Sequence, residues 1–141
     1  MTNFLVKYGY KNKSGSHNQI LSIIPENLHE HFFRGLIDGD GHVSICETSQ
    51  GYKSMSIVTS GPIDQDWSAF SDFCMKRNIS YRIRTENKSS KYSVFIVNKK
   101  KDLLKFINLI FKPEYNYLER KYSKAIEIAT EILKKPKYSS P

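Results

Sequence analysis

The spacing of apolar residues changes period several times along this chain, and few folds accommodate that alternation. Apolar residues recur at helical spacing from Pro25, which suits a helix start, to the glycine-rich turn at 39–41. Two segments with period-two spacing follow, 42–48 and 52–59, joined by the turn residues 49–51. We therefore predict a helix that leads straight into a β-hairpin.

The second half of the chain repeats this pattern. Asp64–Arg77 carries a helical stripe, and the strands 80–86 and 91–97 predict a second hairpin around a polar turn. Two further helices are predicted at 101–111 and 115–133. We expect an α+β fold in the core order α-β-β-α-β-β-α, with one antiparallel four-stranded sheet, helices on one face and the other face open.

With 141 residues, of which 39% are hydrophobic, the chain is long enough for one core but too short for two. We expect one domain at 25–135, an N-terminal arm at 1–24 that is irregular or a short strand, and a C-terminal tail at 136–141. No apolar run reaches the roughly 18 residues of a membrane span and no signal-peptide pattern is present, so neither membrane insertion nor secretion is expected. Cys46 and Cys74 fit neither a zinc spacing nor a disulfide framework, and we interpret them as reduced thiols.

Charge and alternation together predict a basic sheet face. The 22 Lys and Arg residues against 14 Asp and Glu residues give a formal net charge of +8, which is typical of a surface that binds phosphate groups. Alternation along the strands predicts two sets of side chains. Those predicted to face the helices are Val43, Ile45, Met55, Ile57, Tyr81 and Ile83, and those predicted to face outward are His42, Ser44, Cys46, Thr48, Ser54, Ser56, Arg82 and Arg84. The outward set is either an ordinary solvated sheet face or a nucleic-acid surface.

Two carboxylates, Asp38 and Asp40, flank Gly39 where the first helix ends. Such a helix end exposes unpaired carbonyl groups beside the carboxylates, and Mg²⁺ prefers oxygen ligands of both kinds. A calcium loop of the EF-hand type is excluded, because His42, Val43 and Ser49 stand where it needs Asp or Asn, Gly and an acidic residue. The alternative to a metal site is a plain tight turn.

Gly35 and Gly39 lie four residues apart on the same helix, next to Leu36. They remove side chains from one stripe of that helix, so another backbone can approach closely. The stripe indicates either contact with a partner helix or packing within the chain.

Residues 33–41, Phe-Arg-Gly-Leu-Ile-Asp-Gly-Asp-Gly, resemble the nine-residue signature of the LAGLIDADG homing endonucleases. The matching positions are Gly35, Leu36, Ile37, Asp38, Asp40 and Gly41. The order of elements over residues 26–133 is also similar to that family's core. The resemblance implies a saddle-shaped sheet over the DNA major groove, with Asp40 as the metal-binding acidic residue at the scissile phosphate, the Gly39 carbonyl assisting, and Asp38 capping or orienting the turn.

With only one copy of the signature, the resemblance implies a homodimer that contacts through Gly35, Leu36 and Gly39 and carries one Asp40 per DNA strand. The target would be a near-palindromic site with half-sites of about 10 base pairs. The implied cofactor is Mg²⁺, with Mn²⁺ as a substitute and with Ca²⁺ bound without supporting cleavage.

Two further catalytic candidates rest on the resemblance. Lys121 stands at the start of the last helix, where the family typically keeps a basic residue that reaches the active site, although it could instead be a solvated lysine. Ser60 follows the second predicted strand, where some members place Gln, and could hold a water molecule.

For recognition of DNA bases we favour Arg82 and Arg84, because arginine makes paired hydrogen bonds to guanine in the major groove. His42, which begins the outward strand beside Asp40, is predicted as a further DNA contact. Lys88 and residues 99–101 are predicted to contact phosphates, which position DNA without specifying its sequence. The remaining predicted DNA contacts are Ser44, Cys46, Thr48, Ser54, Ser56, Lys91 and Ser93.

These features predict a Mg²⁺-dependent, site-specific double-strand DNA endonuclease that acts as a homodimer inside a cell, in bacterial or phage-infected cytoplasm or in an organelle matrix. The presence of Asp40 and Lys121 favours cleavage. The alternatives are an intron maturase that binds RNA, a DNA-binding regulator that does not cleave, and a basic structural domain that shares only the turn.

Overall fold

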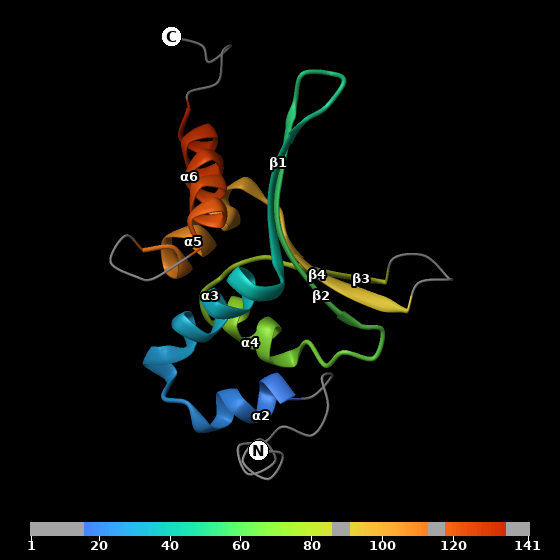
Figure 1. Cartoon of the computed structure of the whole chain (residues 1–141), viewed down its shortest axis with the longest axis vertical. Coiled ribbons are helices and arrows are strands. Elements are labelled where there is room, and N and C mark those ends of the chain that lie inside the picture. The colour runs from blue at the N-terminus through green and yellow to red at the C-terminus, as the bar shows by residue number, and fades with distance from the viewer. Residues whose placement is uncertain (1–15, 86–90, 113–117, 135–141) are drawn as a thin grey trace.

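The computed structural model describes residues 16–85, 91–112 and 118–134 (Figure 1). From the third element on, its order of helices and strands is the predicted one. In chain order the elements are α2 (Ser16–Ile23), a 3-10 helix (Glu26–Leu28), α3 (His29–Asp40), β1 (Gly41–Glu47), β2 (Lys53–Pro62), α4 (Ser68–Lys76), β3 (Arg82–Thr85), β4 (Tyr92–Val97), α5 (Lys100–Ile110) and α6 (Glu119–Leu133).

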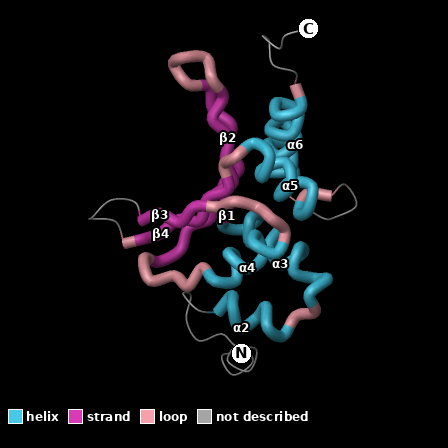
Figure 2. The backbone as a smooth tube through the Cα atoms, turned by 180° about the vertical axis from the view of Figure 1, so that it is seen from behind, coloured by secondary structure: helices cyan, strands magenta, loops and turns pink. Residues whose placement is uncertain are grey.

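The four strands form one antiparallel sheet in the order β1-β2-β4-β3, and the helices lie on one side of it (Figures 1 and 2). The predicted α+β fold is confirmed. The strand β2 is longer than predicted, because it pairs with β1 over its first part and with β4 from Ile57 to Pro62. Residues 60–62, which follow the predicted strand 52–59, are therefore the last part of β2.

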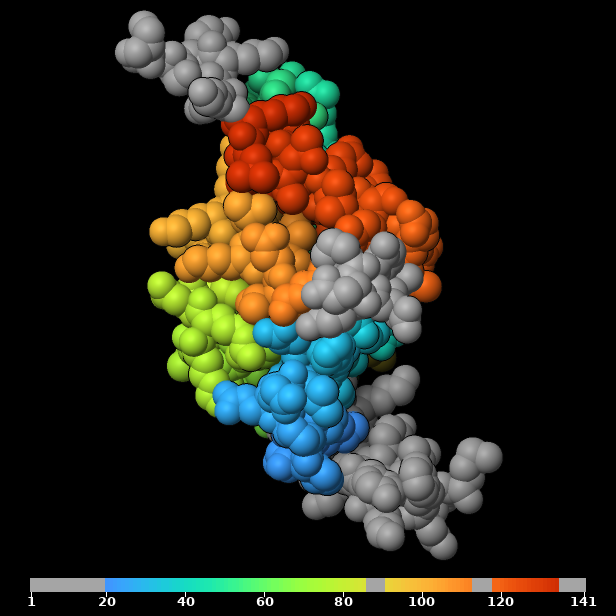
Figure 3. Space-filling model, turned by 90° about the vertical axis from the view of Figure 1, so that its left-hand side faces the viewer, coloured from blue at the N-terminus to red at the C-terminus, as the bar shows by residue number. Residues whose placement is uncertain are grey.

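The core lies between the sheet and the helices. The helices form most of the surface on the side of the molecule that Figure 3 shows. Phe33 of α3 packs edge-on against Phe70 of α4 at 5.0 Å between ring centroids, and Phe70 packs against Phe95 of β4 at 5.3 Å. Leu103 of α5 and Ile128 of α6 are fully buried in the same cluster. Each buried side chain of this size contributes about 1.5 to 3 kcal/mol of transfer free energy, so this layer holds α3 and α6 in place.

The N-terminal arm is not an irregular segment or a strand where the structure describes it. Ser16–Ile23 is the helix α2, and its Leu21 belongs to the core, so the core extends beyond the predicted domain start at residue 25. His29 Nε2 lies 3.1 Å from the carbonyl oxygens of both Leu21 and Ile24 and caps the end of α2. The polar residues before Ile20 concealed the short helical pattern.

Other boundaries differ by a few residues. The helix α4 begins at Ser68 rather than at residue 64, and it ends as predicted near Asn78, which adopts a left-handed φ of 56°. The turn predicted at 87–90, the start of the last helix at 115, the domain limit at 135 and the tail at 136–141 lie outside the described residues.

Both cysteines are free. Burial raises the pKa of the Cys74 thiol to about 12, so this residue is an inert part of the core, whereas Cys46 is exposed on β1. None of the helices in the described part of the chain is long and apolar enough to span a membrane.

Candidate functional site

The end of α3 is held by a lysine from α6. Lys121 Nζ donates hydrogen bonds to the carbonyl oxygens of Ile37 and Asp38, each at 2.6 Å, and the residue is only 8% exposed. The last four carbonyls of a helix lack donors within the helix, and a cation there also interacts favourably with the helix dipole. Lys121 is therefore a buried cap of α3 and not a solvated lysine.

A second contact runs in the opposite direction. Asp38 Oδ2 accepts a hydrogen bond of 3.3 Å from the backbone N–H of Leu118, the residue that precedes α6. The other carboxylate oxygen, Oδ1, is buried, and no described residue hydrogen-bonds to it. Asp38 thus caps a helix 80 residues further along the chain, and each of the two helices caps the other.

Several charges act on the Lys121 ammonium. Burial lowers the pKa of Lys121, and the charge of Arg120 lowers it further, whereas the carboxylates of Asp38 and Asp40 raise it. An ammonium group has three N–H donors, and two of them are used by the helix carbonyls. One donor is left for a further acceptor.

Asp40 is the last residue of α3 and is exposed. Within residues 16–85, 91–112 and 118–134, its carboxylate has no hydrogen-bond or ion-pair partner. The next residue, Gly41, already belongs to β1, and a Cβ there would lie 2.7 Å from both the Cα and the carbonyl oxygen of Ile37. Only glycine lets the chain pass directly from helix to strand, and this turn leaves the Asp40 carboxylate at the corner between them.

The strand register brings Ser60 to the same corner. Gly41 pairs with Thr59, so Ser60 is the next residue of β2 beyond the end of β1. Ser60 is exposed and pairs with Val94 on the outward face. Asp40, Lys121 and Ser60 therefore lie around one end of α3, although they come from three different elements.

The glycine stripe of α3 lies apart from the other described residues. Gly35 and Gly39 are exposed, and a Cβ added to either would meet no atom within 4 Å. Leu36, which lies between them, is half-buried against the core. No residue in the described ranges packs into the space beside this stripe.

The register also identifies the outward face of the sheet, because directly paired residues point to the same side. One row across the strands consists of His42, Val58, Ile96 and Arg82, and a second consists of Ser60, Val94 and Arg84. The hydroxyls of Ser44 and Ser56 lie 3.0 Å apart on this face, with the pair Cys46 and Ser54 beyond them. Sequence alternation correctly predicted as outward-facing His42, Ser44, Cys46, Ser54, Ser56, Arg82 and Arg84.

Two predictions about the faces need correction, and one residue on the helix side is more exposed than expected. Ser93 does not face outward: it is 2% exposed, accepts a hydrogen bond from Trp67 Nε1 at 2.9 Å and donates one to the Pro62 carbonyl, because it is in phase with the core residue Phe95. Ile83 pairs with the core residue Phe95 and so lies on the predicted helix side, but it is 46% exposed because β3 is an edge strand. The outward face, predicted as a whole to be polar and basic, has an apolar centre, since Val58, Val94 and Ile96 lie there.

The other predicted DNA contacts have varied positions. Thr48 is exposed, and its Oγ1 accepts a hydrogen bond from the N–H of Tyr52 in the turn between β1 and β2. Lys91 is exposed just before β4, and residues 99–101 are exposed at the start of α5. Lys88 lies outside the described residues.

For a metal ion, one chain offers few ligands. No group of three His, Cys, Asp or Glu side chains comes together in the part of the chain that the structure describes. What it does offer is the exposed Asp40 carboxylate beside the Gly39 carbonyl, which lies in the last turn of α3.

Comparison with known proteins gives similarity only at the level of structure. No protein-family model and no curated protein matches this chain. The homing endonuclease I-CvuI, solved in complex with its target in the presence of Ca, matches with a TM-score of 0.58 at 19% identity, over 74% of this chain and 66% of that one. The archaeal intron-encoded homing endonuclease I-Vdi141I, complexed with DNA, matches with a TM-score of 0.57 at 20% identity, over 75% and 69%.

The LAGLIDADG homing endonuclease I-GzeII, in complex with its DNA target, matches with a TM-score of 0.59 at 25% identity over 77% of this chain. The present chain spans about two thirds of the length of I-CvuI and 36% of that of I-GzeII. The open antiparallel sheet, the covering helices and these structural matches agree. The chain therefore has the fold of the LAGLIDADG homing endonucleases.

Proposed function

We propose that this protein is a site-specific double-strand DNA endonuclease of the single-motif LAGLIDADG type, which acts as a homodimer inside the cell. The observation that carries the proposal is the Asp40 carboxylate, exposed and unpartnered among the described residues at the corner between α3 and the outward sheet face. Support also comes from the fold, because I-GzeII and I-Vdi141I were both solved with DNA.

The homodimer is supported by the open stripe at Gly35 and Gly39, with Leu36 between them. In such a dimer the two signature helices pack against each other and bring together two Asp40 carboxylates, one for each DNA strand. A single chain has only one such carboxylate at this corner, so cleavage of both strands requires the second copy.

The ligands at the corner fit Mg²⁺ as a partial site. The Asp40 carboxylate and the Gly39 carbonyl are hard oxygen donors, and Mg²⁺ in nucleic-acid enzymes is usually held by one or two carboxylates together with substrate phosphate and water. Bound Mg²⁺ would polarise the scissile phosphate and lower the pKa of an attacking water. We include Mn²⁺ as a substitute, and Ca²⁺ as an ion that binds without supporting cleavage.

The chain's own residues would act as follows. Lys121 fixes the last turn of α3 and so the direction of the Asp40 carboxylate, and its remaining N–H stabilises charge on the phosphate. Ser60 holds a water molecule at the same corner. Arg82 and Arg84 donate paired hydrogen bonds to guanine, and the outward polar residues of β1 and β2 make further contacts in the major groove.

The test is cleavage of a randomised duplex DNA library with and without Mg²⁺, by the wild-type protein, by Asp40→Asn and by the matched control Asp72→Asn, which removes an exposed carboxylate from α4. We expect discrete double-strand cuts at a near-palindromic site for the wild type and the control and none for Asp40→Asn, while Asp40→Asn still binds DNA. Tight DNA binding by the wild type without cuts would identify a non-cleaving regulator instead. Preferential binding of structured RNA would identify a maturase. Cleavage by Asp40→Asn would show that another residue carries the chemistry.

A further inference from the structure

A pocket of about 250 Å³ lies beside the candidate active site, between the start of β1 and the first turns of α6. The strand contributes Gly41, His42 and Val43, and the helix contributes a set of basic residues. Because Gly41 directly follows Asp40, the pocket begins one residue away from the proposed catalytic carboxylate. The helix α6 packs against β1 along this side of the molecule (Figure 1).

The helix wall of the pocket is strongly basic. It consists of Arg120, Lys121 and Lys124, and no acidic residue lines the pocket. Two of the three N–H donors of Lys121 are used by the carbonyl groups at the end of α3, and the third is assigned above to the scissile phosphate. Arg120 and Lys124 remain, and residues four apart on a helix present their side chains on the same face.

Neither of these two cations is strongly neutralised. Arg120 is exposed, and none of the described residues forms an ion pair with it. The Lys124 side chain is 51% exposed, and its contact with Glu127, three residues on, is long at 3.6 Å and half-exposed at both ends. Such a surface pair is weak and exchanges easily with another anion. The pocket thus presents net positive charge to whatever occupies it.

Arginine and lysine together at a small concave site are suited to a phosphate group. A guanidinium donates two parallel hydrogen bonds to phosphate oxygens, and an ammonium adds a point charge. We propose that Arg120 and Lys124 form a phosphate-binding site for the DNA backbone, which holds a phosphate flanking the scissile one while Asp40 acts. This rests on the proposed function, since the phosphate belongs to the DNA that is cut.

The first experiment measures how DNA affinity depends on salt. Binding of a labelled duplex without divalent metal is followed by fluorescence anisotropy between 50 and 300 mM KCl. The proteins compared are the wild type, the double variant Arg120→Gln/Lys124→Gln and the matched control Lys76→Gln/Lys105→Gln, which removes the same charge from α4 and α5. Each lost phosphate contact should reduce the slope of log affinity against log salt by about 0.9. We therefore expect a smaller slope for the Arg120/Lys124 variant, with the control close to the wild type.

A second experiment locates the phosphate, using the cut site mapped with the library. Backbone phosphates near the cut are replaced one at a time by neutral methylphosphonates. The wild type should lose affinity, by about tenfold, at one flanking position per half-site, and the double variant should show no further loss there. Equal losses of affinity in both proteins, or equal salt slopes for the double variant and the control, would contradict the phosphate site at Arg120 and Lys124.

A wild type that binds no DNA at low salt would instead refute the proposed function itself. Circular dichroism confirms that each variant is folded.

Discussion

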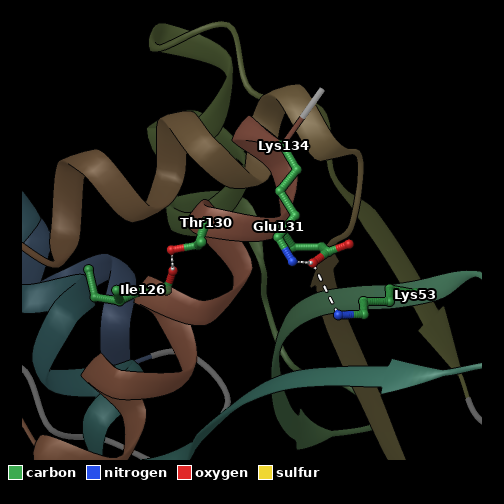
Figure 4. Close-up of polar contacts among 5 residues, drawn as sticks. All are labelled: Lys53, Ile126, Thr130, Glu131 and Lys134. Carbon is green, nitrogen blue, oxygen red and sulfur yellow. Dashed lines mark hydrogen bonds and ion pairs between the residues drawn. The ribbon is translucent and has the colours of Figure 1, made fainter. Parts of the chain in front are cut away.

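The two ends of α6 are attached to the rest of the protein by different kinds of contact. At its start, Lys121 is buried and donates to two main-chain carbonyls at 2.6 Å, while Asp38 accepts from the N–H that precedes the helix. At its end, Glu131 Oε2 accepts hydrogen bonds at the surface from two lysines. These are Lys53 Nζ of β2 at 3.1 Å and Lys134 Nζ at 3.0 Å (Figure 4). One end is fixed by buried contacts with backbone, and the other by surface charges.

This difference suits the positions of the two ends. Buried hydrogen bonds to backbone are insensitive to salt and tolerate little movement, and they lie where the Asp40 carboxylate needs a fixed direction. Surface ion pairs are weak and screened by salt, and the pair with Lys53 lies where the long hairpin of β1 and β2 meets α6. The protein is expected to be rigid at the candidate site and adjustable at the hairpin.

The largest effect should come from removing the buried cation. Lys121→Met takes both hydrogen bonds from the end of α3 and leaves the Asp38 carbonyl without its donor, so we expect the free energy of unfolding to fall by about 3 kcal/mol. Urea denaturation measures this, with the half-exposed Lys124→Met as the control. If Lys121→Met and Lys124→Met lowered the free energy of unfolding equally, the buried contacts of Lys121 would contribute no more stability than the surface contact of Lys124.

A backbone collision should have the next largest effect. Gly41→Ala places a Cβ 2.7 Å from two backbone atoms of Ile37, and relieving that overlap should cost about 2 kcal/mol of unfolding free energy. Gly39→Ala, two residues earlier, meets no atom within 4 Å and should not destabilise the isolated protomer. Denaturation of both variants at dilute protein concentration distinguishes them, and a harmless Gly41→Ala would contradict the close approach.

The reciprocal cap should have a smaller effect. Asp38→Ala removes the acceptor for the Leu118 N–H and should lower the free energy of unfolding by about 1 kcal/mol. Asp38→Asn keeps an oxygen acceptor and should remain close to the wild type. If Asn is as damaging as Ala, the carboxylate charge matters rather than the cap.

The smallest effect is expected at the surface end. Hydrogen bonds from Lys134 and Lys53 lower the pKa of Glu131. The same hydrogen bond between Lys53 and Glu131 raises the pKa of Lys53. The carboxylate's contribution is therefore present above its ordinary pKa of about 4.3 and is lost as pH falls through the lowered value, while the lysine's contribution is lost only as pH rises through its raised value.

In NMR spectra, the amide signals around Lys53 should hence shift only in acid below that ordinary value and at high alkaline pH. Glu131→Gln should shift them at neutral pH and should remove their response to salt, without a measurable change in global stability. A large loss of stability in this variant would show that the surface end is as important as the buried one.

Sequence alone predicted the fold well where periodicity was long and clean. The two hairpins and the apolar stripes of α3 and α5 follow from spacing, since burial of one face dictates that spacing. It failed at α2, where Ile20 and Leu21 are the residues of the described stretch 20–23 that are not exposed, and at Ser93, whose phase is fixed by pairing with Gly61 and not by its polarity.

At the candidate site, the sequence identified Asp40 as an acidic residue at a helix end and placed Lys121 near it through resemblance. The bonds of Lys121 to Ile37 and Asp38 were not predictable, because they join residues more than 80 positions apart in the chain. The basic pocket was missed for the same reason, since Arg120 and Lys124 line a pocket only together with residues at the start of β1, which are distant in the sequence.

The direct passage from α3 into β1 has a mechanical consequence. Asp40 is the last residue of the helix and Gly41 is the first residue of the strand, so no connecting loop separates them. The helix and the strand should therefore move together as one rigid unit. In any assembly built through α3, the angle at which two helices cross then sets the angle between the two sheets. A substitution that changes this crossing angle would therefore change the angle between the two sheets.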